Sequence, residues 1–203
     1  MTAKQLWQRI QREVGTRPDG EPGSATAQAV AAKLGIDITE PALVSTSNAA
    51  RWPRDTDAEM AAFYGDRGQN VTQITPPYQL FYEGRALKTI TVHKRIASAV
   101  QAALAEVLSV YGIERIKELK LDQFDGCLAV RKKRGGSSWS VHSYAAALDF
   151  GAEWNSLHQD HTTALYARPE YEAWWQAWER QGAVSLGRQC DFDWMHVQFV
   201  RLV

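Results

Sequence analysis

Apolar side chains recur every three or four residues in several stretches of the chain, and this spacing predicts helices. Leu6, Ile10 and Val14 form one apolar stripe that ends before Gly15, and Ser24 can cap a second helix that ends at Gly35. The longest helix is expected to begin at Lys94 and to end at Gly112; its apolar positions are Ile96, Val100, Leu104, Val107, Leu108 and Tyr111. Shorter helices are expected at DAEMAAFYG, residues 57–65, and at YEAWWQAWERQG, residues 171–182.

Short apolar runs between turn residues predict strands from residue 80 onward. LFYEGRALKTITVH, residues 80–93, is expected to form a hairpin around Glu83 and Gly84. Further strands are expected at CLAVR (127–131), AALDFG (146–151) and DWMHVQFVRL (193–202). Because strands and helices do not alternate regularly, we expect an α+β fold: a small antiparallel sheet with flanking helices, plus a short N-terminal helical segment.

Composition and turn residues divide the chain into three parts. Residues 1–36 are expected to form a helical segment, residues 37–75 a linker and the start of the main domain, and residues 76–203 the rest of the main domain. The pattern DGxxGxxTxxAV, residues 19–30, resembles the start of a peptidoglycan-binding domain of the small three-helix type. That resemblance implies binding to the cell wall; the alternative is a short helical hairpin that packs on the main domain.

Composition also excludes several classes of function. Of the 203 residues 45% are hydrophobic, which is enough for a full core, and Lys+Arg equals Asp+Glu at 23 each, so no nucleic-acid binding is expected. No run of about 18 uncharged apolar residues exists, so we expect no membrane insertion. The N-terminus lacks the apolar core of a signal peptide, so we expect a protein made in the cytoplasm. We further expect a monomer. Cys127 and Cys190 lack the CxxC spacing of a zinc site and are expected to be reduced thiols.

Two of the predicted strands and the turn before one of them carry side chains that burial alone does not require. Asp149 lies between Leu148 and Phe150, where an ionised carboxylate needs a cation, and no Lys or Arg is near it in sequence. His142 precedes it by seven residues, and His196 lies on the polar face of the last strand. Two imidazoles and one carboxylate make three ligands and leave a fourth position for water, as in catalytic zinc sites. Asp193 is then placed to accept a proton without binding the metal.

These residues lie in two motifs that together resemble a known family. Residues 140–149, SVHSYAAALD, are similar to the SxHxxGxAxD motif of the zinc D-Ala-D-Ala carboxypeptidase and L-alanyl-D-glutamate endopeptidase family. DWMH, residues 193–196, is similar to the (D/E)xxH motif of the same family, and GCLAVRKKRGG, residues 126–136, resembles the region before the first motif. The likeness covers about residues 50–203, and residues 80–100 resemble phage members in particular.

The resemblance implies a fold, a cofactor and a set of roles. The fold would be that of the D-Ala-D-Ala peptidases and hedgehog proteins. His142, Asp149 and His196 would bind Zn²⁺, Asp193 would be the general base, Arg131 would stabilise the oxyanion or hold a substrate carbonyl, and Ser140 would bind substrate or orient the loop. The substrate would be a peptidoglycan peptide. Phage members of the family are endolysins that reach the periplasm through a separate membrane pore, which agrees with an N-terminus that lacks a signal peptide.

One residue departs from the family motif, and it supports a competing interpretation. The family glycine of HxxGxAxD is Ala145 here; if this position has a positive φ, alanine would cost about 1 kcal/mol or shift the loop. The first hypothesis, which rests on the complete set of predicted ligands and Asp193, is an active endolysin. The alternatives are a catalytically impaired wall-binding or virion protein on the same fold, and a bacterial wall-remodelling carboxypeptidase.

The remaining histidines and the tryptophans are given structural interpretations. His158 and His161 lie in a polar stretch and are expected at the surface, and His93 is expected to pack or cap at a strand end. The tryptophans of residues 171–182 are expected in the core, with a sugar-binding aromatic surface as the alternative.

Overall fold

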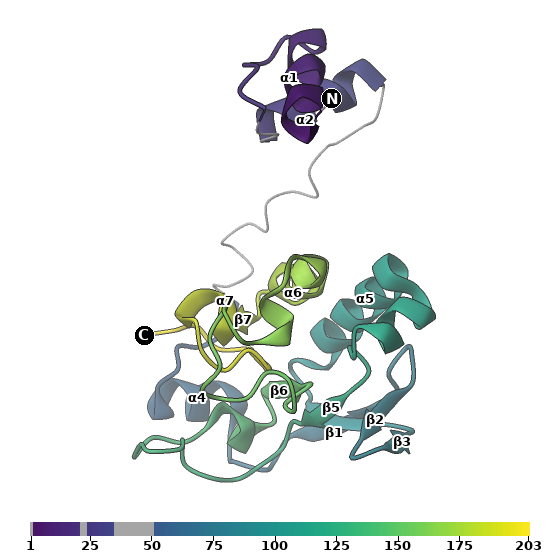
Figure 1. Ribbon diagram of the computed structural model, residues 1–203. Helices are drawn as coiled ribbons and strands as arrows, with labels where there is room; N and C mark the ends of the chain where they lie inside the picture. Colours follow the sequence, from purple (N-terminus) through teal and green to yellow (C-terminus); the bar gives the residue numbers. More distant parts are fainter. Residues whose placement is uncertain (1, 21–23, 35–50) are drawn as a thin grey trace. The chain divides into compact units, whose positions relative to one another are not determined.

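The computed structural model describes residues 2–20, 24–34 and 51–203, and divides the chain into two compact units, residues 1–43 and 44–203 (Figure 1). Helices and small antiparallel sheets are mixed in the second unit, which confirms the α+β prediction. Gly35 and the first part of the predicted linker, residues 37–50, lie outside the described residues, as do residues 21–23 of the DGxxGxxTxxAV pattern.

The first unit contains α1 (Ala3–Glu13) and α2 (Ser24–Leu34). Thr2 caps α1: its Oγ1 accepts a hydrogen bond from the Gln5 backbone N–H, and Gln5 Oε1 accepts one from the Thr2 N–H. The buried Gln11 side chain donates to Asp19 Oδ1 at 2.7 Å and accepts from the Gly20 N–H at 2.7 Å, so it ties the loop after α1 to the helix. These contacts give two residues of the wall-binding-like pattern, Asp19 and Gly20, a structural role.

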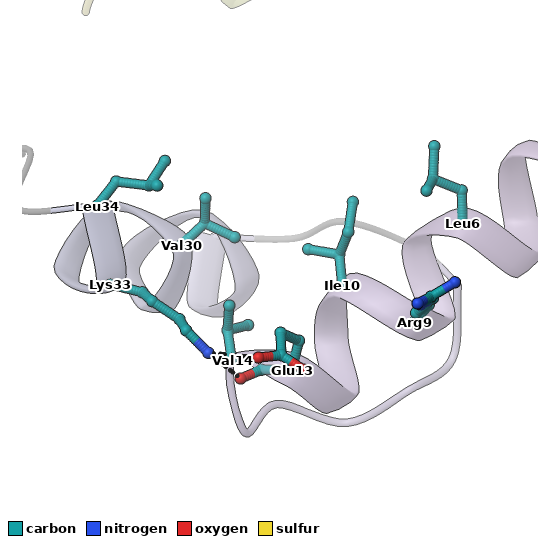
Figure 2. A pocket seen from close by; sticks show the side chains of 8 residues that line it. All are labelled: Leu6, Arg9, Ile10, Glu13, Val14, Val30, Lys33 and Leu34. Atoms are coloured by element: carbon teal, nitrogen blue, oxygen red, sulfur yellow. Dashed lines mark hydrogen bonds and ion pairs between the residues drawn. The ribbon is translucent and has the colours of Figure 1, made fainter.

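A shallow cavity of about 450 Å³ lies between α1 and α2 (Figure 2). The side chains of Leu6, Ile10, Val30 and Leu34 point to the same side, and Lys33 Nζ forms an ion pair with Glu13 at 2.7 Å at its edge. The predicted stripe of Leu6, Ile10 and Val14 therefore lines this cavity.

The second unit contains a four-stranded antiparallel sheet in the order β5-β6-β8-β7. Its strands are β5 (Phe124–Gly126), β6 (Ala147–Phe150), β7 (Val184–Ser185) and β8 (His196–Gln198). Two antiparallel pairs accompany it: β1 (Val71–Ile74) with β4 (Ile90–His93), and β2 (Leu80–Tyr82) with β3 (Arg85–Leu87). The β2–β3 hairpin turns at Glu83 and Gly84 as predicted, and both turn residues have positive φ.

Helices cover this framework. Figure 1 shows α5 (Ala97–Glu118) and α6 (Glu172–Arg180) side by side on one side of the strands. The short helix α7 (Leu186–Cys190) contacts β7 and β8, and α4 (Asp57–Tyr64) contacts the segment of residues 141–144. Short 3₁₀ helices lie at η1 (Val141–Tyr144), η2 (Leu165–Ala167) and η3 (Pro169–Tyr171). No helix in residues 2–20, 24–34 or 51–203 combines the length and the apolar character needed to cross a bilayer.

One part of the core lies between the sheet and α6, and the buried side chains of α4, α5 and β4 continue it. Trp174, Trp175 and Trp178 are buried, as predicted for this helix, and Phe150 of β6 contacts Trp174 and Trp178 with ring centroids 5.0 and 5.5 Å apart. Phe199, just after β8, packs on Trp52 at 5.1 Å. Buried aromatic pairs of this kind add about 0.5–1.5 kcal/mol each beyond their buried area, so the back of the two central strands is firmly held.

Two predicted boundaries were wrong. The strand expected at CLAVR, residues 127–131, lies earlier at Phe124–Gly126, because the segment after Gly126 turns away to carry the basic loop. The helix end predicted at Gly112 is confirmed: α5 consists of two helical runs that meet at Gly112, whose torsion angles are non-helical (φ 66°, ψ 164°), and the second run, which buries Ile116, was not predicted. The last strand is limited to His196–Gln198, and β1, β7 and α7 were not predicted because they are too short for a periodic signal.

Candidate metal centre

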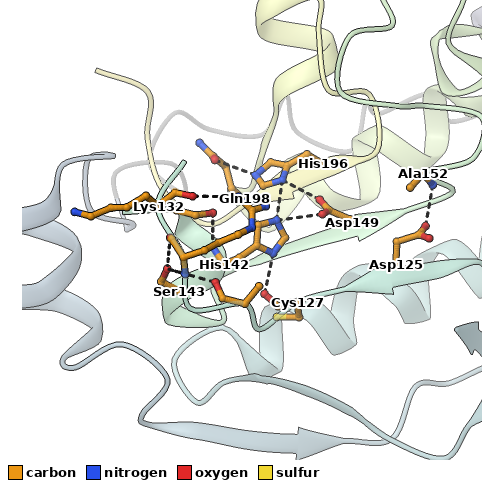
Figure 3. A network of polar contacts seen from close by, with 12 residues as sticks. Asp125, Cys127, Lys132, His142, Ser143, Asp149, Ala152, His196 and Gln198 are labelled. Carbon is orange, nitrogen blue, oxygen red and sulfur yellow. Dashed lines mark hydrogen bonds and ion pairs between the residues drawn. The ribbon is translucent and has the colours of Figure 1, made fainter. Parts of the chain in front are cut away.

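Three predicted residues come together at the middle of the four-stranded sheet. Asp149 on β6 and His196 on β8 are direct cross-strand partners, and His142 lies in η1, the turn that leads into β6. One ligand atom from each residue, an imidazole nitrogen or a carboxylate oxygen, lies within 4.8 Å of the others. Cross-strand pairing places two of these side chains next to each other, and the turn brings in the third (Figure 3).

The distances within this cluster suit a small tetrahedral metal site. His142 Nε2 is 3.2 Å from Asp149 Oδ2 and 3.2 Å from His196 Nδ1, and His196 Nδ1 is 2.9 Å from Asp149 Oδ1. A tetrahedral zinc site with bonds of about 2.0–2.1 Å separates its ligand atoms by about 3.3 Å. The donor set, two imidazoles and one carboxylate, and its spacing therefore fit a metal ion that has an open fourth position.

The hydrogen bonds around the two histidines determine which nitrogen of each ring faces the cluster. His142 Nδ1 lies 2.8 Å from the Cys127 backbone oxygen, which can only accept, so Nδ1 carries the proton and Nε2 is left as a ligand. His196 Nε2 lies 3.1 Å from Gln198 Oε1, so Nε2 is the donor and Nδ1 is the ligand. Both rings thus turn their other nitrogen, His142 Nε2 and His196 Nδ1, toward Asp149.

The charges in the cluster stabilise one another in the absence of a metal. Burial alone would raise the pKa of the Asp149 carboxyl, but the charges and hydrogen bonds of His142 and His196 outweigh burial and hold this pKa well below its usual range. Burial alone would lower the pKa of His196, but the hydrogen bond and charge of Asp149, with smaller contributions from Asp193 and Gln198, raise it. An ionised carboxylate at the centre is what a cation requires.

Asp193 lies beside the cluster in an unusual environment. It is 8% exposed, its Oδ1 has no hydrogen-bond partner within the described part of the chain, and its backbone is left-handed, with φ 56°. Burial raises the pKa of its carboxyl, His196 opposes this and Asp149 adds to it. A strained, buried carboxylate with an unpartnered oxygen is typical of a functional group, because strain persists only where the surrounding structure holds it in place.

Ser140 and Arg131 lie on the loop next to η1. Ser140 Oγ accepts from the His142 N–H at 3.3 Å and so caps the 3₁₀ turn that carries His142. The Arg131 backbone is fixed on both sides by Ser143: Ser143 Oγ donates to the Arg131 carbonyl at 2.8 Å and accepts from its N–H at 3.0 Å. The Arg131 side chain is exposed and has no ion pair among the described residues.

Two cavities meet at the cluster. One, of about 370 Å³, is lined by Ser140, Asp193, His196 and Gln198 together with basic residues of the loop, among them Lys133. The other, of about 540 Å³, extends along β4 and β5 past Asp125. His142, Asp149, Arg131 and Arg134 line both, so a chain-like ligand can extend to either side of the metal centre.

Ala145 occupies a left-handed position, with φ 51° and ψ 36°, at the end of η1. The residue is fully buried, and its carbonyl accepts from the His93 N–H at 2.8 Å. The condition under which an alanine is strained here is therefore met, at about 1–2 kcal/mol. The backbone nevertheless keeps this conformation, and the residues on both sides of it, His142 and Asp149, remain within reach of each other.

The other histidines lie apart from the cluster, whereas each cysteine lines one of the two cavities that meet at it. His93 Nε2 lies 2.9 Å from the Tyr64 carbonyl and its Nδ1 accepts from the Arg95 N–H, so it is a satisfied packing residue, as predicted. His158 and His161 are exposed, as predicted, and His161 forms an ion pair with Asp191 at 2.6 Å. Cys127 is a buried free thiol, whereas Cys190 is exposed.

Sequence reasoning missed the residues that hold the ligands in place. Ser143, the Cys127 carbonyl and the amide of Gln198 received no role, although the two-residue alternation of the last strand put Gln198 on the same face as His196. Backbone carbonyls such as that of Cys127 leave no signal in a sequence.

Comparisons with known proteins add no identification: no protein-family model matches the chain, and neither the curated proteins nor the solved structures give a significant match.

Proposed function

We propose that residues 44–203 form a zinc-dependent peptidase that hydrolyses an amide bond in the stem peptide or cross-link of peptidoglycan, and that the protein acts as a phage endolysin. One observation carries the proposal: two histidines and one aspartate with a metal-binding arrangement lie beside a buried, unpartnered aspartate in a cavity. The motif resemblance to the zinc D-Ala-D-Ala peptidase family supports the substrate class and the peptidase fold.

A bound Zn²⁺ would supply Lewis-acid polarisation of the scissile carbonyl and a lowered pKa of water. His142 Nε2, His196 Nδ1 and one oxygen of Asp149 would hold it, since these are the atoms that the hydrogen bonds of the outer ring leave available. Asp193 then accepts a proton from water in the cavity and later donates it to the leaving amine. Its raised pKa, which is caused chiefly by burial, makes the carboxylate a better proton acceptor than an ordinary aspartate and so favours the first step.

Arg131 and Ser140 have supporting roles in this proposal. The Arg131 guanidinium lines both cavities at the metal centre and would stabilise the negative charge that develops on the carbonyl oxygen. Ser140 positions His142 through its cap and lines the 370 Å³ cavity. A substrate that occupies both cavities would place an internal amide at the metal, which favours endopeptidase activity over removal of a terminal residue.

The proposal is tested by digestion of purified Gram-negative sacculi with the zinc-loaded protein, with and without a chelator, followed by mass spectrometry of the released fragments. Chelator-sensitive release of peptides is expected, and the fragment masses would identify the bond. A folded, zinc-loaded sample that releases nothing would contradict the proposal and favour the wall-binding alternative. A His196→Ala variant serves as the control for a contaminating hydrolase.

A further inference from the structure

Gln198 stands out because only half of its side-chain amide is used. The residue is 2% exposed and lines the 370 Å³ cavity. Its Oε1 accepts from His196 Nε2 at 3.1 Å, whereas its Nε2 is buried without a hydrogen-bond partner in the part of the chain that the structure describes. Figure 3 shows the amide nitrogen directed away from His196. A buried amide donor left unpaired costs about 1–3 kcal/mol, so it needs an explanation.

The orientation of the amide agrees with the role of His196 as a metal ligand. A His196 ring that offers its Nδ1 lone pair to a metal must carry its proton on Nε2, so the atom of Gln198 that faces the ring must be an acceptor. The NH₂ group is thereby directed to the other side. β8 is a central strand that pairs with β6 and β7 on either side, which holds this geometry rigidly.

The surroundings of the NH₂ group favour an anionic oxygen as its partner. Lys133, Arg131 and Arg134 line the same cavity, and neither arginine has an ion pair among the described residues. The acidic groups of the cavity have other functions: Asp55 pairs with Lys133 at 2.7 Å, Asp149 belongs to the metal centre and Asp193 is the proposed base. Three basic and three acidic side chains thus line the cavity, and a bound divalent metal ion would leave positive charge in excess there.

We propose that Gln198 couples the metal centre to substrate: its Oε1 fixes His196 for metal binding, and its NH₂ group donates to a carboxylate of the peptide that occupies the 370 Å³ cavity. The identity of the peptide ligand rests on the proposed function. The effect of Gln198 on metal binding through His196 is independent of that function. Gln198 is thus a positioning residue toward the metal and a specificity residue toward the peptide.

Two near-isosteric variants separate these roles. Gln198→Glu retains an acceptor for His196 Nε2 but loses the donor and adds a negative charge, whereas Gln198→Met removes both. We expect Gln198→Met to bind zinc about 10–100-fold more weakly, and Gln198→Glu to bind it as tightly as the wild type or more tightly. Zinc affinity is measured by competition with a chromophoric chelator. Gln73→Glu, on the exposed side of β1 and in neither cavity, is the matched control and should change nothing.

Peptide binding is measured by calorimetry on zinc-loaded protein in an Asp193→Asn background, so that bound peptide is not cleaved. The probes are a stem pentapeptide with free carboxylates and the same peptide with these groups converted to carboxamides. With Gln198 present, we expect the free acid to bind about tenfold more tightly or better, since hydrogen bonds to charged groups contribute about 1.5–3 kcal/mol. With Gln198→Glu, this preference should vanish or reverse.

Unchanged zinc affinity in Gln198→Met, or a retained free-acid preference in Gln198→Glu, would overturn the inference. A purely structural role would instead lower the thermal stability of both metal-free variants and shift both affinities in the same direction. If the variants behave as expected but the wild type releases nothing from sacculi, the hydrolytic function fails and the role of Gln198 stands.

Discussion

Replacing Asp193 by asparagine should separate catalysis from metal binding and from stability. Asparagine has the same shape and tolerates positive φ better than most residues, so the left-handed backbone at φ 56° can be kept. The backbone bonds that hold the segment, Asp193 N–H to the Leu157 carbonyl and His196 N–H to the Asp193 carbonyl, are unaffected. What is lost is the proton acceptor.

Loss of a general base costs about 10²–10⁴-fold in turnover, which corresponds to about 2.7–5.4 kcal/mol of activation free energy. Stability should change in the opposite direction. Burial raises the pKa of Asp193, so its ionised form is disfavoured by folding, and the stability that the protonated form contributes is lost as pH rises through the folded pKa. The metal-free Asp193→Asn protein should therefore be more stable than the wild type at neutral pH, and this gain should shrink as pH falls toward about 3.9.

The assay combines three measurements: rate of peptide release from sacculi, zinc affinity, and urea unfolding of the metal-free protein at several pH values. Asp191→Asn is a matched control, because Asp191 has nearly the same backbone angle, φ 55°, but is exposed and bonded to His161. It should retain turnover within a few-fold. Wild-type turnover in Asp193→Asn would refute the role as a base, and loss of zinc would make Asp193 a ligand instead.

Three further outcomes are expected. His196→Ala should abolish the rise in melting temperature that zinc causes in the wild type, as measured by calorimetry with and without the metal; an undiminished rise would place the metal elsewhere. Since Asp149 raises the pKa of His196 and a metal must displace that proton, the zinc-induced rise should be larger at pH 8 than at pH 5.5, and a flat profile would contradict a histidine site. Ala145→Gly should change the free energy of unfolding by no more than about 1 kcal/mol, because relief of left-handed strain offsets the added chain entropy and the lost methyl group. Ala145→Val should lower it by about 2–4 kcal/mol, because a larger side chain is forced into the same buried backbone position. Equal effects of the two variants in urea unfolding would show that φ is not constrained at this residue.

The fold class could be predicted from the pattern of apolar residues, and the three-residue cluster from two motifs taken together, because no single spacing among its residues is specific. A carboxylate between Leu148 and Phe150 in a buried strand demands a partner, and His196 alternates with apolar neighbours in the last strand. Helix α6 was predictable from its apolar spacing and its tryptophans, which fill the core.

Other features depend on tertiary structure and were not predictable. The strand at β5 was displaced because its pairing with β6, not its own composition, determines which residues are extended. Gly112 ends a helical run as expected, but the second run beyond it, which buries Ile116, had no clear signal in the sequence. The Cys127 carbonyl orients His142, and the Ser143 hydroxyl holds the Arg131 backbone. Both contacts involve backbone groups, which every residue has, so the sequence gives no sign of them.

The direct pairing of Asp149 with His196 has a consequence for how the chain folds. The two residues lie opposite each other in the β6–β8 pair, next to Leu148 opposite Val197. A slip of one residue between these strands would move each set of side chains to the other face of the sheet and part the aspartate from the histidine. A metal ion present during folding can therefore be held only by the native alignment. The bound ion would stabilise the native alignment of the central strands relative to misaligned intermediates, which bury apolar side chains but cannot bind the metal.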